Sequence, residues 1–284
     1  MTSPVVLITG SSRGIGRATA LTLAEHGARV VITARDMTAL EQVASDIRAR
    51  GGQCLALCMD VTDPASIRQA IHQAHAHYGR IDVLVNNAGM LRFADIAQTS
   101  ATDWARTLST NLTGPFLCIQ AVLPIMLAQG HGHIINIASQ AGLYGFANLG
   151  AYSASKFGLV GLSQSLGREL QGSGINVSYL CPGAVTTDML SAFPEHAAAA
   201  MPQDTPEHIA QCIYELTAGD KTAFQRVSFW HKMIRYIKRR LGFSQIKVWS
   251  SRLNGLLAIM FFPGLSKLVA SAEFLMTDLP AVIM

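Results

Sequence analysis

The sequence predicts an α/β fold in which helices cover both faces of a doubly wound parallel sheet of about seven strands. Short apolar runs rich in β-branched residues alternate along the chain with segments of helical periodicity. These runs are continuously apolar and do not alternate with polar residues, which indicates strands buried on both faces, as in a parallel sheet. Right-handed crossovers then connect successive strands.

The expected strands follow one another at regular intervals, at 5–9, 29–34, 54–60, 81–87, 132–139 and 175–182, with a seventh at 222–229. Between the first two, apolar residues recur at helical spacing until Gly27, which is typical of a helix end. The third helix is expected to begin at Asp63, a capping residue followed by Pro64, and the second at Asp36.

The composition is that of a folded domain. Of the 284 residues, 50% are hydrophobic and 14% charged, enough apolar material for a buried core and too much for a disordered chain. The five cysteines show no CxxC pair and no metal-ligand spacing, so we expect reduced thiols, no metal and a cytoplasmic location. The first residues have no basic region and only a short apolar run, which predicts neither a signal peptide nor an anchor.

A glycine-rich turn follows the first expected strand. The segment TGSSRGIG places Gly10, Gly14 and Gly16 between that strand and the next helix. In this context glycines let the backbone approach a pyrophosphate at the positive end of a helix. The turn therefore predicts a dinucleotide site in a Rossmann-like fold.

Charge at the end of the second strand indicates which dinucleotide is bound. The strand ends in Ala34 and Arg35, where such a fold commonly places an acid for the ribose 2′-hydroxyl. Arg35, with Arg13 in the glycine turn, offers two guanidinium groups that suit a 2′-phosphate dianion. The expected cofactor is NADP(H). Asp36 could pair with Arg35 and so compete with the 2′-phosphate, but we favour a role for Asp36 as a helix cap.

The remaining motifs stand on later strands and helices. NNAG ends the fourth expected strand at 86–89, Ser139 ends the fifth, and Tyr152 precedes Lys156 by four residues. Four residues are about one helical turn, so the phenol and the ammonium share a helix face. In this order, the glycine turn and these motifs resemble the short-chain dehydrogenase/reductase (SDR) superfamily of NADP-preferring type, over roughly residues 4–220.

The resemblance implies a role for each motif. The catalytic group would be Asn111, Ser139, Tyr152 and Lys156, and all four are present. Adenine would lie against the third strand's end and the nicotinamide against the segment after the sixth strand. The implied cofactor-binding residues are Gly10, Ser12, Arg13, Gly14, Ile15, Gly16, Arg35, Asp60, Val61, Asn87, Ala88, Gly89, Tyr152, Lys156, Pro182, Gly183, Val185 and Thr187.

The chemistry of the four catalytic residues can be argued from general principles. A hydride that reaches a carbonyl carbon leaves an alkoxide, which needs a proton from a nearby acid. Tyr152 can supply it if its pKa, about 10 when unperturbed, is lowered, and we expect the cation of Lys156 to lower it. Ser139 would hydrogen-bond the substrate oxygen, and Asn111 would position a water that links Lys156 to solvent. The resemblance adds that Lys156 holds the nicotinamide ribose.

The substrate is less well defined. The segment 189–204, where the resembled family has a mobile substrate lid, is rich in alanine and methionine, which favours an apolar or lipid-like ketone or secondary alcohol. Within this class, a 3-oxoacyl-thioester reductase of fatty acid or polyketide type and a steroid- or retinoid-type enzyme both remain open. A non-catalytic NADPH-binding sensor or scaffold is the alternative from another class, and the intact catalytic group argues against it. The preference for NADPH favours reduction.

The end of the chain differs in charge from the rest. Residues 1–220 contain 12 basic and 16 acidic residues, whereas 221–272 contain ten basic residues and no acid. We therefore expect a catalytic domain at 1–229 and a basic amphipathic extension at 230–284. The extension could pack on its own domain, on a partner subunit or on an anionic membrane surface, or bind an acidic carrier or thioester. Nucleic acid binding is not expected. The resemblance implies a homodimer, and the unusual tail puts a tetramer in doubt.

Overall fold

The computed structural model describes residues 3–201 and 203–219, so the predictions for 222–229 and 230–284 concern residues outside this part of the chain. Six parallel strands form the central sheet in the order β3-β2-β1-β4-β5-β6. Their bounds are Val5–Thr9 for β1, Arg29–Ala34 for β2, Gln53–Cys58 for β3, Val83–Asn86 for β4, Gly132–Ile137 for β5 and Ile175–Leu180 for β6. The predicted doubly wound α/β fold is confirmed.

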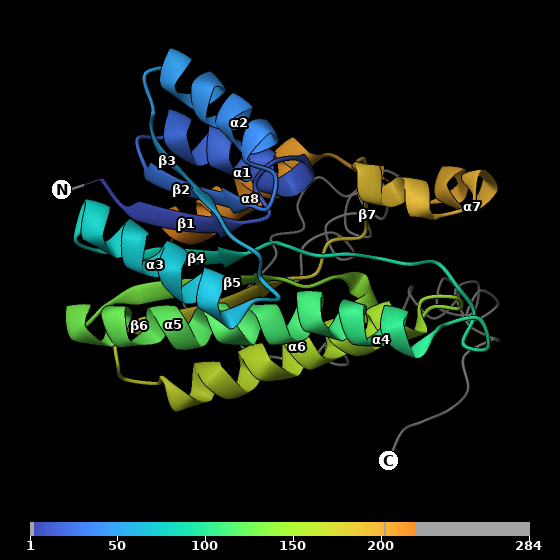
Figure 1. The fold of residues 1–284 in the computed structure, drawn as a ribbon. Helices are drawn as coiled ribbons and strands as arrows, with labels where there is room; N and C mark the ends of the chain where they lie inside the picture. Colours follow the sequence, from blue (N-terminus) through green and yellow to red (C-terminus); the bar gives the residue numbers. More distant parts are fainter. Residues whose placement is uncertain (1–2, 202, 220–284) are drawn as a thin grey trace, which may run out of the picture. The chain divides into compact units, whose positions relative to one another are not determined.

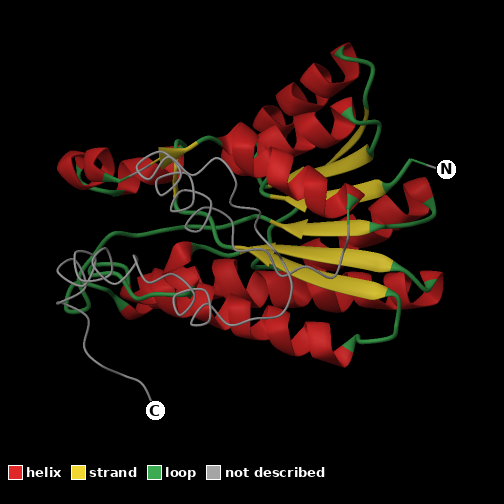
Figure 2. Cartoon of the chain, turned by 180° about the vertical axis from the view of Figure 1, so that it is seen from behind, coloured by secondary structure: helices red, strands yellow, loops and turns green. Residues whose placement is uncertain are grey.

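Helices cover both faces of this sheet (Figure 1, Figure 2). One face carries α1, Gly14–Glu25, α2, Met37–Ala49, and α8, Pro206–Ala218; the other carries α3, Pro64–Tyr78, α5, Gly114–Gln129, and α6, Gly150–Glu169. Each layer has its own apolar cluster, and neighbouring residues of one strand belong to opposite clusters: Val6 faces the first layer and Leu7 the second. Burial on both faces explains why the strands are continuously apolar.

The predicted helix boundaries agree with the local contacts. Asp63 Oδ1 accepts a hydrogen bond of 2.9 Å from the Ala65 amide at the start of α3, and Asp36 Oδ1 accepts one of 3.1 Å from Ala39 at the start of α2. Helix α1 ends at Glu25, and Gly27 follows with a φ of +82°, a left-handed conformation that favours glycine. Both caps and the helix end were predicted correctly.

A long helical stretch leads from α4, Ala101–Leu108, through a π-helical turn, Ser109–Thr113, into α5. Within the described ranges, Ala101–Gln129 is the one helix whose length and composition would allow it to cross a membrane. In this fold Cys118, Val122 and Met126 of α5 are fully buried against the sheet and α3. The apolar character of this helix is therefore accounted for in part by the core.

The segment expected to form a lid has regular structure. After β6 the chain forms β7, Ala184–Val185, a 3₁₀ turn, Asp188–Ala192, helix α7, Glu195–Ala200, and β8, Gln203–Asp204. Strands β7 and β8 pair in parallel, apart from the main sheet. This two-residue pair was not predicted, because runs so short have no detectable periodicity.

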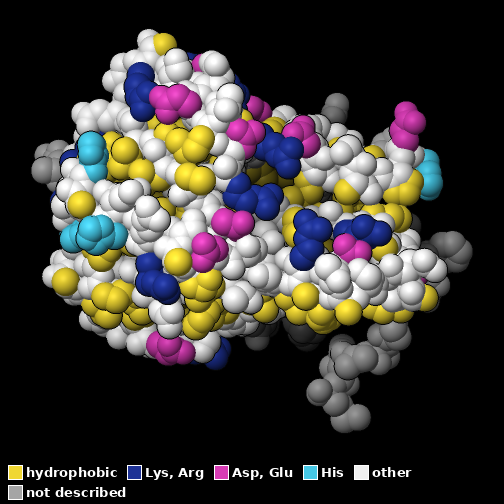
Figure 3. Space-filling view, in the orientation of Figure 1, with side chains coloured by type: hydrophobic (Ala, Val, Ile, Leu, Met, Phe, Trp, Pro, Cys, Tyr) yellow, Lys and Arg dark blue, Asp and Glu magenta, His cyan; other side chains and the backbone are white. Residues whose placement is uncertain are grey.

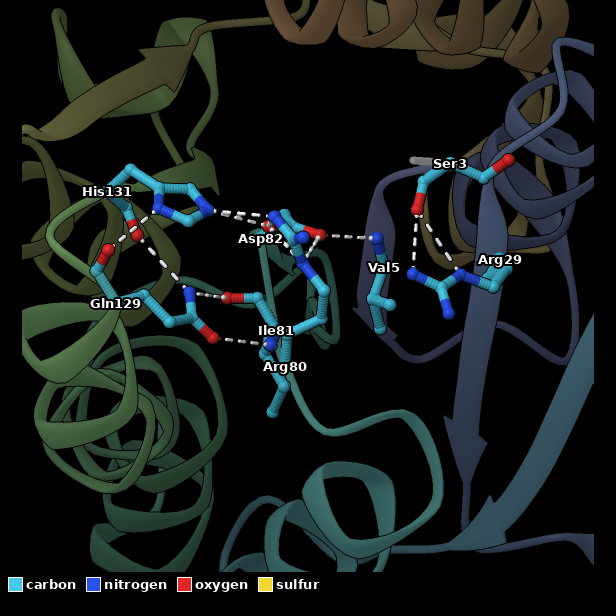
Figure 4. A network of polar contacts seen from close by, with 8 residues as sticks. All are labelled: Ser3, Val5, Arg29, Arg80, Ile81, Asp82, Gln129 and His131. Atoms are coloured by element: carbon cyan, nitrogen blue, oxygen red, sulfur yellow. Dashed lines mark hydrogen bonds and ion pairs between the residues drawn. The ribbon is translucent and has the colours of Figure 1, made fainter. Parts of the chain in front are cut away.

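A polar network joins three strands at the amino end of the sheet (Figure 4). The carboxylate of Asp82 accepts a 2.7 Å hydrogen bond from the Val5 amide, pairs with Arg80, and lies 3.0 Å from His131 Nε2. Burial alone would raise the pKa of Asp82, but the hydrogen bonds from Arg80, Val5 and His131 outweigh it and hold the pKa below its usual value. This network stabilises the edge opposite to the one where the predicted site residues lie.

Candidate active site

The predicted site residues meet at the carboxyl ends of the strands, around a cleft of about 1300 Å³. This edge includes the point between β1 and β4 where the strand order reverses, the usual ligand site of an open α/β sheet. Basic side chains gather around the hollow on this face (Figure 3). Of the predicted catalytic and cofactor residues, all line the cleft except Gly16 and Asn111, which lie behind its wall.

The glycine turn fits tightly against the neighbouring strand end. A Cβ on Gly16 would lie 2.3 Å from Gly10 O and 2.5 Å from Asn87 Nδ2, and one on Gly10 would lie 2.8 Å from the Ala88 Cα. Gly10 and Gly14 have φ values of +67° and +54°. The turn therefore tolerates no side chain at Gly10 or Gly16, which keeps the amino end of α1 open toward the cleft, as a pyrophosphate requires.

Thr9 joins this turn to NNAG. Its Oγ1 accepts hydrogen bonds from the amides of Asn87, at 3.0 Å, and Ala88, at 2.9 Å. In return Asn87 Nδ2 donates to Thr9 O, at 2.9 Å, and to Gly10 O, at 3.0 Å. The sequence reasoning gave Thr9 no part in this contact, although a hydroxyl directly before the glycine turn was available as a signal.

Both predicted arginines and Asp60 line the cleft, where the adenosine of a dinucleotide was expected. Burial would raise the pKa of Asp60, but hydrogen bonds from Thr62 and the nearby charge of Arg35 hold it below its usual value. Arg13 instead forms an ion pair of 3.2 Å with Asp188, which was not predicted. Two guanidinium groups beside an open helix terminus fit the phosphates of NADP(H), so the residues present suit this cofactor.

Tyr152, Ser139 and Lys156 lie together at the centre of the cleft. Tyr152 is buried and hydrogen-bonded to Ser139. Lys156 Nζ lies 5.7 Å from the centre of the Tyr152 ring and donates a 2.7 Å hydrogen bond to Ile137 O at the end of β5. Helix α6 thus presents the phenol and the ammonium on one face, as their spacing predicted, and the turn after β5 supplies the serine.

The pKa of Tyr152 differs from our expectation. Burial raises it above its ordinary value, opposed by the hydrogen bond with Ser139, and the predicted lowering by Lys156 is not seen. The reason lies in the lysine itself: its ammonium is directed to the Ile137 carbonyl, and burial lowers its own pKa from 10.5 to about 8. The phenol is therefore fully protonated at neutral pH in this structure, ready to act as an acid.

Asn111 occupies the π-helical turn and holds one wall of the site. Its Oδ1 accepts a 2.8 Å hydrogen bond from the Met90 amide, and its Nδ2 donates to Met90 O, at 2.8 Å, and to Ser155 Oγ, at 3.1 Å. Single π-helical turns inside longer helices are frequent at functional sites. The amide therefore fixes the loop after β4 relative to the helix that carries Tyr152. Sequence reasoning did not find Ser155 as its partner.

Apolar side chains pack around Tyr152 at the cleft. Tyr152 packs with Leu149, and around them lie Leu91, Phe93 and Phe193. The rings of Phe93, from the loop after β4, and Phe193, just before α7, are 5.4 Å apart. Opposite, Pro182, Gly183, Val185 and Thr187 line the cleft after β6, as the sequence led us to expect. In the described segments 3–201 and 203–219, no cluster of three potential metal ligands is present.

Comparison with known proteins identifies a family model and relatives that this chain matches. The family model for short chain dehydrogenases matches residues 4–198. The 3-oxoacyl-[acyl-carrier-protein] reductase of Synechocystis sp. is 42% identical over 190 residues, covering 66% of this chain and 77% of the relative. The 3-oxoacyl-[acyl-carrier-protein] reductase FabG of Escherichia coli is 38% identical over 227 residues, covering 78% and 91%.

Solved structures with cofactor extend this likeness. A variant of actinorhodin polyketide ketoreductase, solved with NADPH, superposes with a TM-score of 0.73 at 33% identity, covering 78% of this chain and 95% of its own. A metagenomic short-chain oxidoreductase in complex with NADP gives a TM-score of 0.68 at 36% identity, covering 78% and 94%. From the family match, the sequence identities and the shared fold it follows that this chain belongs to the short chain dehydrogenase family.

Proposed function

We propose that this protein is an NADP(H)-dependent ketoreductase that interconverts a ketone and a secondary alcohol on an apolar substrate. The observation that supports this most directly is the meeting of Ser139, Tyr152 and Lys156 in one cleft with the glycine turn and Arg35. The relatives named as reductases, and the structural neighbours solved with NADPH or NADP, support the same reaction class and cofactor.

Each catalytic residue of the cleft has its own role in the reaction. When bound, NADPH supplies a hydride to the carbonyl carbon of the substrate. Ser139 donates a hydrogen bond to the substrate oxygen and orients it toward Tyr152. The Tyr152 phenol, which burial keeps protonated, gives that oxygen the proton it needs as negative charge develops. The oxidation uses the same groups in reverse, with the phenolate as base.

Lys156 and Asn111 support this proton transfer. With a pKa of about 8, Lys156 carries a positive charge at neutral pH and stabilises a phenolate once the proton has left. A lysine so close to neutrality can also return a proton to Tyr152, and solvent can resupply it through a water held near Asn111. Arg13 and Arg35 would hold the 2′-phosphate, the glycine turn the pyrophosphate, and Lys156 the nicotinamide ribose.

The shape and lining of the cleft favour a substrate with an apolar body. Leu91, Phe93, Leu149 and Phe193 surround the phenol, so the carbon chain next to the carbonyl leaves water when it binds. The 3-oxoacyl thioester is the second candidate substrate, supported by the two relatives named as 3-oxoacyl-[acyl-carrier-protein] reductases. Free and thioester-linked ketones share this chemistry and differ in what lies beyond the reacting carbon.

NADPH oxidation, followed at its nicotinamide absorbance, tests this proposal. Ketones of graded chain length and matched 3-oxoacyl thioesters serve as substrates. We expect kcat/KM to rise with chain length and Tyr152→Phe to lower kcat at least about 100-fold while NADPH still binds. Tyr78→Phe, on α3 far from the cleft, is the matched control and should keep its activity. Unchanged turnover in Tyr152→Phe would refute the assignment of the acid, and NADPH binding without turnover on any substrate would favour the sensor alternative.

We also propose a homodimer and a cytoplasmic location. Phe116 and Leu127 on α5 and Phe157 on α6 are 45%, 50% and 44% exposed, and they support a homodimer through these helices. Sedimentation velocity of the wild type beside Phe157→Lys would show a dimer converted to a monomer. A cytoplasmic location remains our expectation, and contact of 230–284 with an anionic membrane remains a prediction that vesicle co-sedimentation can decide.

A further inference from the structure

Asp188 and Arg13 form an ion pair across the mouth of the cleft. Arg13 belongs to the glycine turn, and Asp188 opens the 3₁₀ turn Asp188–Ala192, 175 residues later in the chain. Arg13 Nη1 lies 3.2 Å from Asp188 Oδ2, and the two side chains are 77% and 71% exposed. Both residues also line the cleft, so the pair lies where the cofactor would enter.

The residues next to this pair also lie close together. A Cβ on Gly14, next to Arg13, would lie 3.2 Å from the Cγ2 of Thr187, next to Asp188. Thr187 therefore lies close to the glycine turn. This proximity places the Asp188 carboxylate within reach of the Arg13 guanidinium.

We propose that Asp188 is a cofactor-specificity residue that competes with the 2′-phosphate of NADP(H) for Arg13. The inference rests on the proposed NADP(H) function and adds to it a residue from the 3₁₀ turn after β7. In the structure the carboxylate takes the guanidinium that a phosphate dianion would use. Phosphate can displace it, because a dianion with three oxygens forms stronger bidentate contacts with arginine than an exposed carboxylate does.

Asp188 should weaken NADPH binding whether Arg13 leaves the carboxylate or contacts both the carboxylate and the 2′-phosphate. If Arg13 leaves Asp188 completely, the ion pair is lost when NADPH binds, and this loss weakens binding. If Arg13 contacts both groups, the carboxylate stays close to the phosphate and repels it. Either way Asp188 weakens binding of a 2′-phosphorylated dinucleotide more than binding of NADH, which has no charge at that position.

Removing the carboxylate should therefore change the affinity for NADPH and not the affinity for NADH. Asp188→Asn should tighten NADPH binding by about two- to fivefold, the factor that corresponds to an exposed ion pair, and leave NADH binding unchanged. Adenosine 2′,5′-bisphosphate, which lacks the nicotinamide half, should bind Asp188→Asn more tightly than the wild type by the same factor. The affinity for AMP, which has no 2′-phosphate, should not change. Asp188→Glu, which keeps the charge, should behave like the wild type.

Fluorescence titration and calorimetry measure these affinities without turnover. The matched control is Asp46→Asn, which opens another exposed pair, between Asp46 and Arg17 on α2 and α1, at 2.9 Å. It should change neither affinity. If Asp188→Asn binds NADPH and NADH more tightly by the same factor, or binds NADPH no more tightly than the wild type does, the proposed role of Asp188 is wrong. Wild-type protein that binds neither NADPH nor the bisphosphate would instead refute the proposed NADP(H) function, and this inference with it.

Discussion

Lys156 should make the protein less stable at neutral pH than at moderately alkaline pH, and Lys156→Met should remove this dependence. The side chain is 4% exposed, and burial lowers its pKa from 10.5 to about 8. Between these two values the unfolded chain binds a proton that the folded protein does not. Unfolding is therefore favoured by low pH across this window, and stability rises as pH increases from below 8 toward 10.5.

The two pKa values give the size of the effect. A difference of 2.5 units at about 1.4 kcal/mol each lowers the free energy of unfolding by about 3 kcal/mol at pH 7. At about pH 9.5 the folded lysine is almost fully deprotonated, and about 1.4 kcal/mol of this penalty remains. The wild type should therefore gain about 2 kcal/mol over Lys156→Met between about pH 7 and about pH 9.5.

Urea unfolding at both pH values measures this change. The methionine also leaves Ile137 O without its 2.7 Å donor, but that loss is independent of pH and cancels in the comparison. Arg168→Met, on the exposed face of the same helix, is the matched control, because its charge does not change in this range. A gap between wild type and Lys156→Met that stays constant with pH would refute the argument that burial depresses this lysine.

Two further substitutions test opposite ends of the sheet. Gly16→Ala should abolish NADPH binding, measured by calorimetry, because its Cβ would lie 2.3 Å from Gly10 O and 2.5 Å from Asn87 Nδ2; retained affinity would contradict this tight fit. Asp82→Asn should lower the free energy of unfolding by about 1–3 kcal/mol at neutral pH while kcat/KM stays unchanged. Because the folded pKa of Asp82 is depressed, this gap should shrink as pH falls below about 4, and a gap that persists in acid would show that its charge is not the cause.

Much of the fold was predictable because its signals are local. Strands buried on both faces are continuously apolar, and Asp36, Asp63 and Gly27 mark helix ends by short-range hydrogen bonds or backbone conformation. The candidate site was predictable for a related reason. Its residues follow strand ends, and parallel strands bring their ends to one edge of the sheet.

The contacts between distant side chains were not predictable in this way. The Arg13–Asp188 pair joins residues 175 positions apart, and the direction of Lys156 toward Ile137 O depends on how deeply α6 is buried. We expected Lys156 to lower the pKa of Tyr152 from their spacing alone. Spacing puts two groups on one helix face but does not give the burial of each, and burial determines the direction of the pKa shift here.

The hydrogen bonds between Thr9 and NNAG give the two walls of the cleft different stiffness. On one side, four contacts of 2.9–3.0 Å connect the ends of β1 and β4, so the glycine turn and Asn87 can only move together. On the other, the segment after β7 meets the rest of the domain through the exposed Arg13–Asp188 pair, the approach of Thr187 to the glycine turn, and the packing of Phe193 beside Phe93 and Tyr152. Substitutions that change which ketone is reduced should therefore be found mainly in the segment 189–204. The wall formed by the glycine turn and NNAG should stay unchanged, so that one mode of NADP(H) binding can serve many substrate specificities.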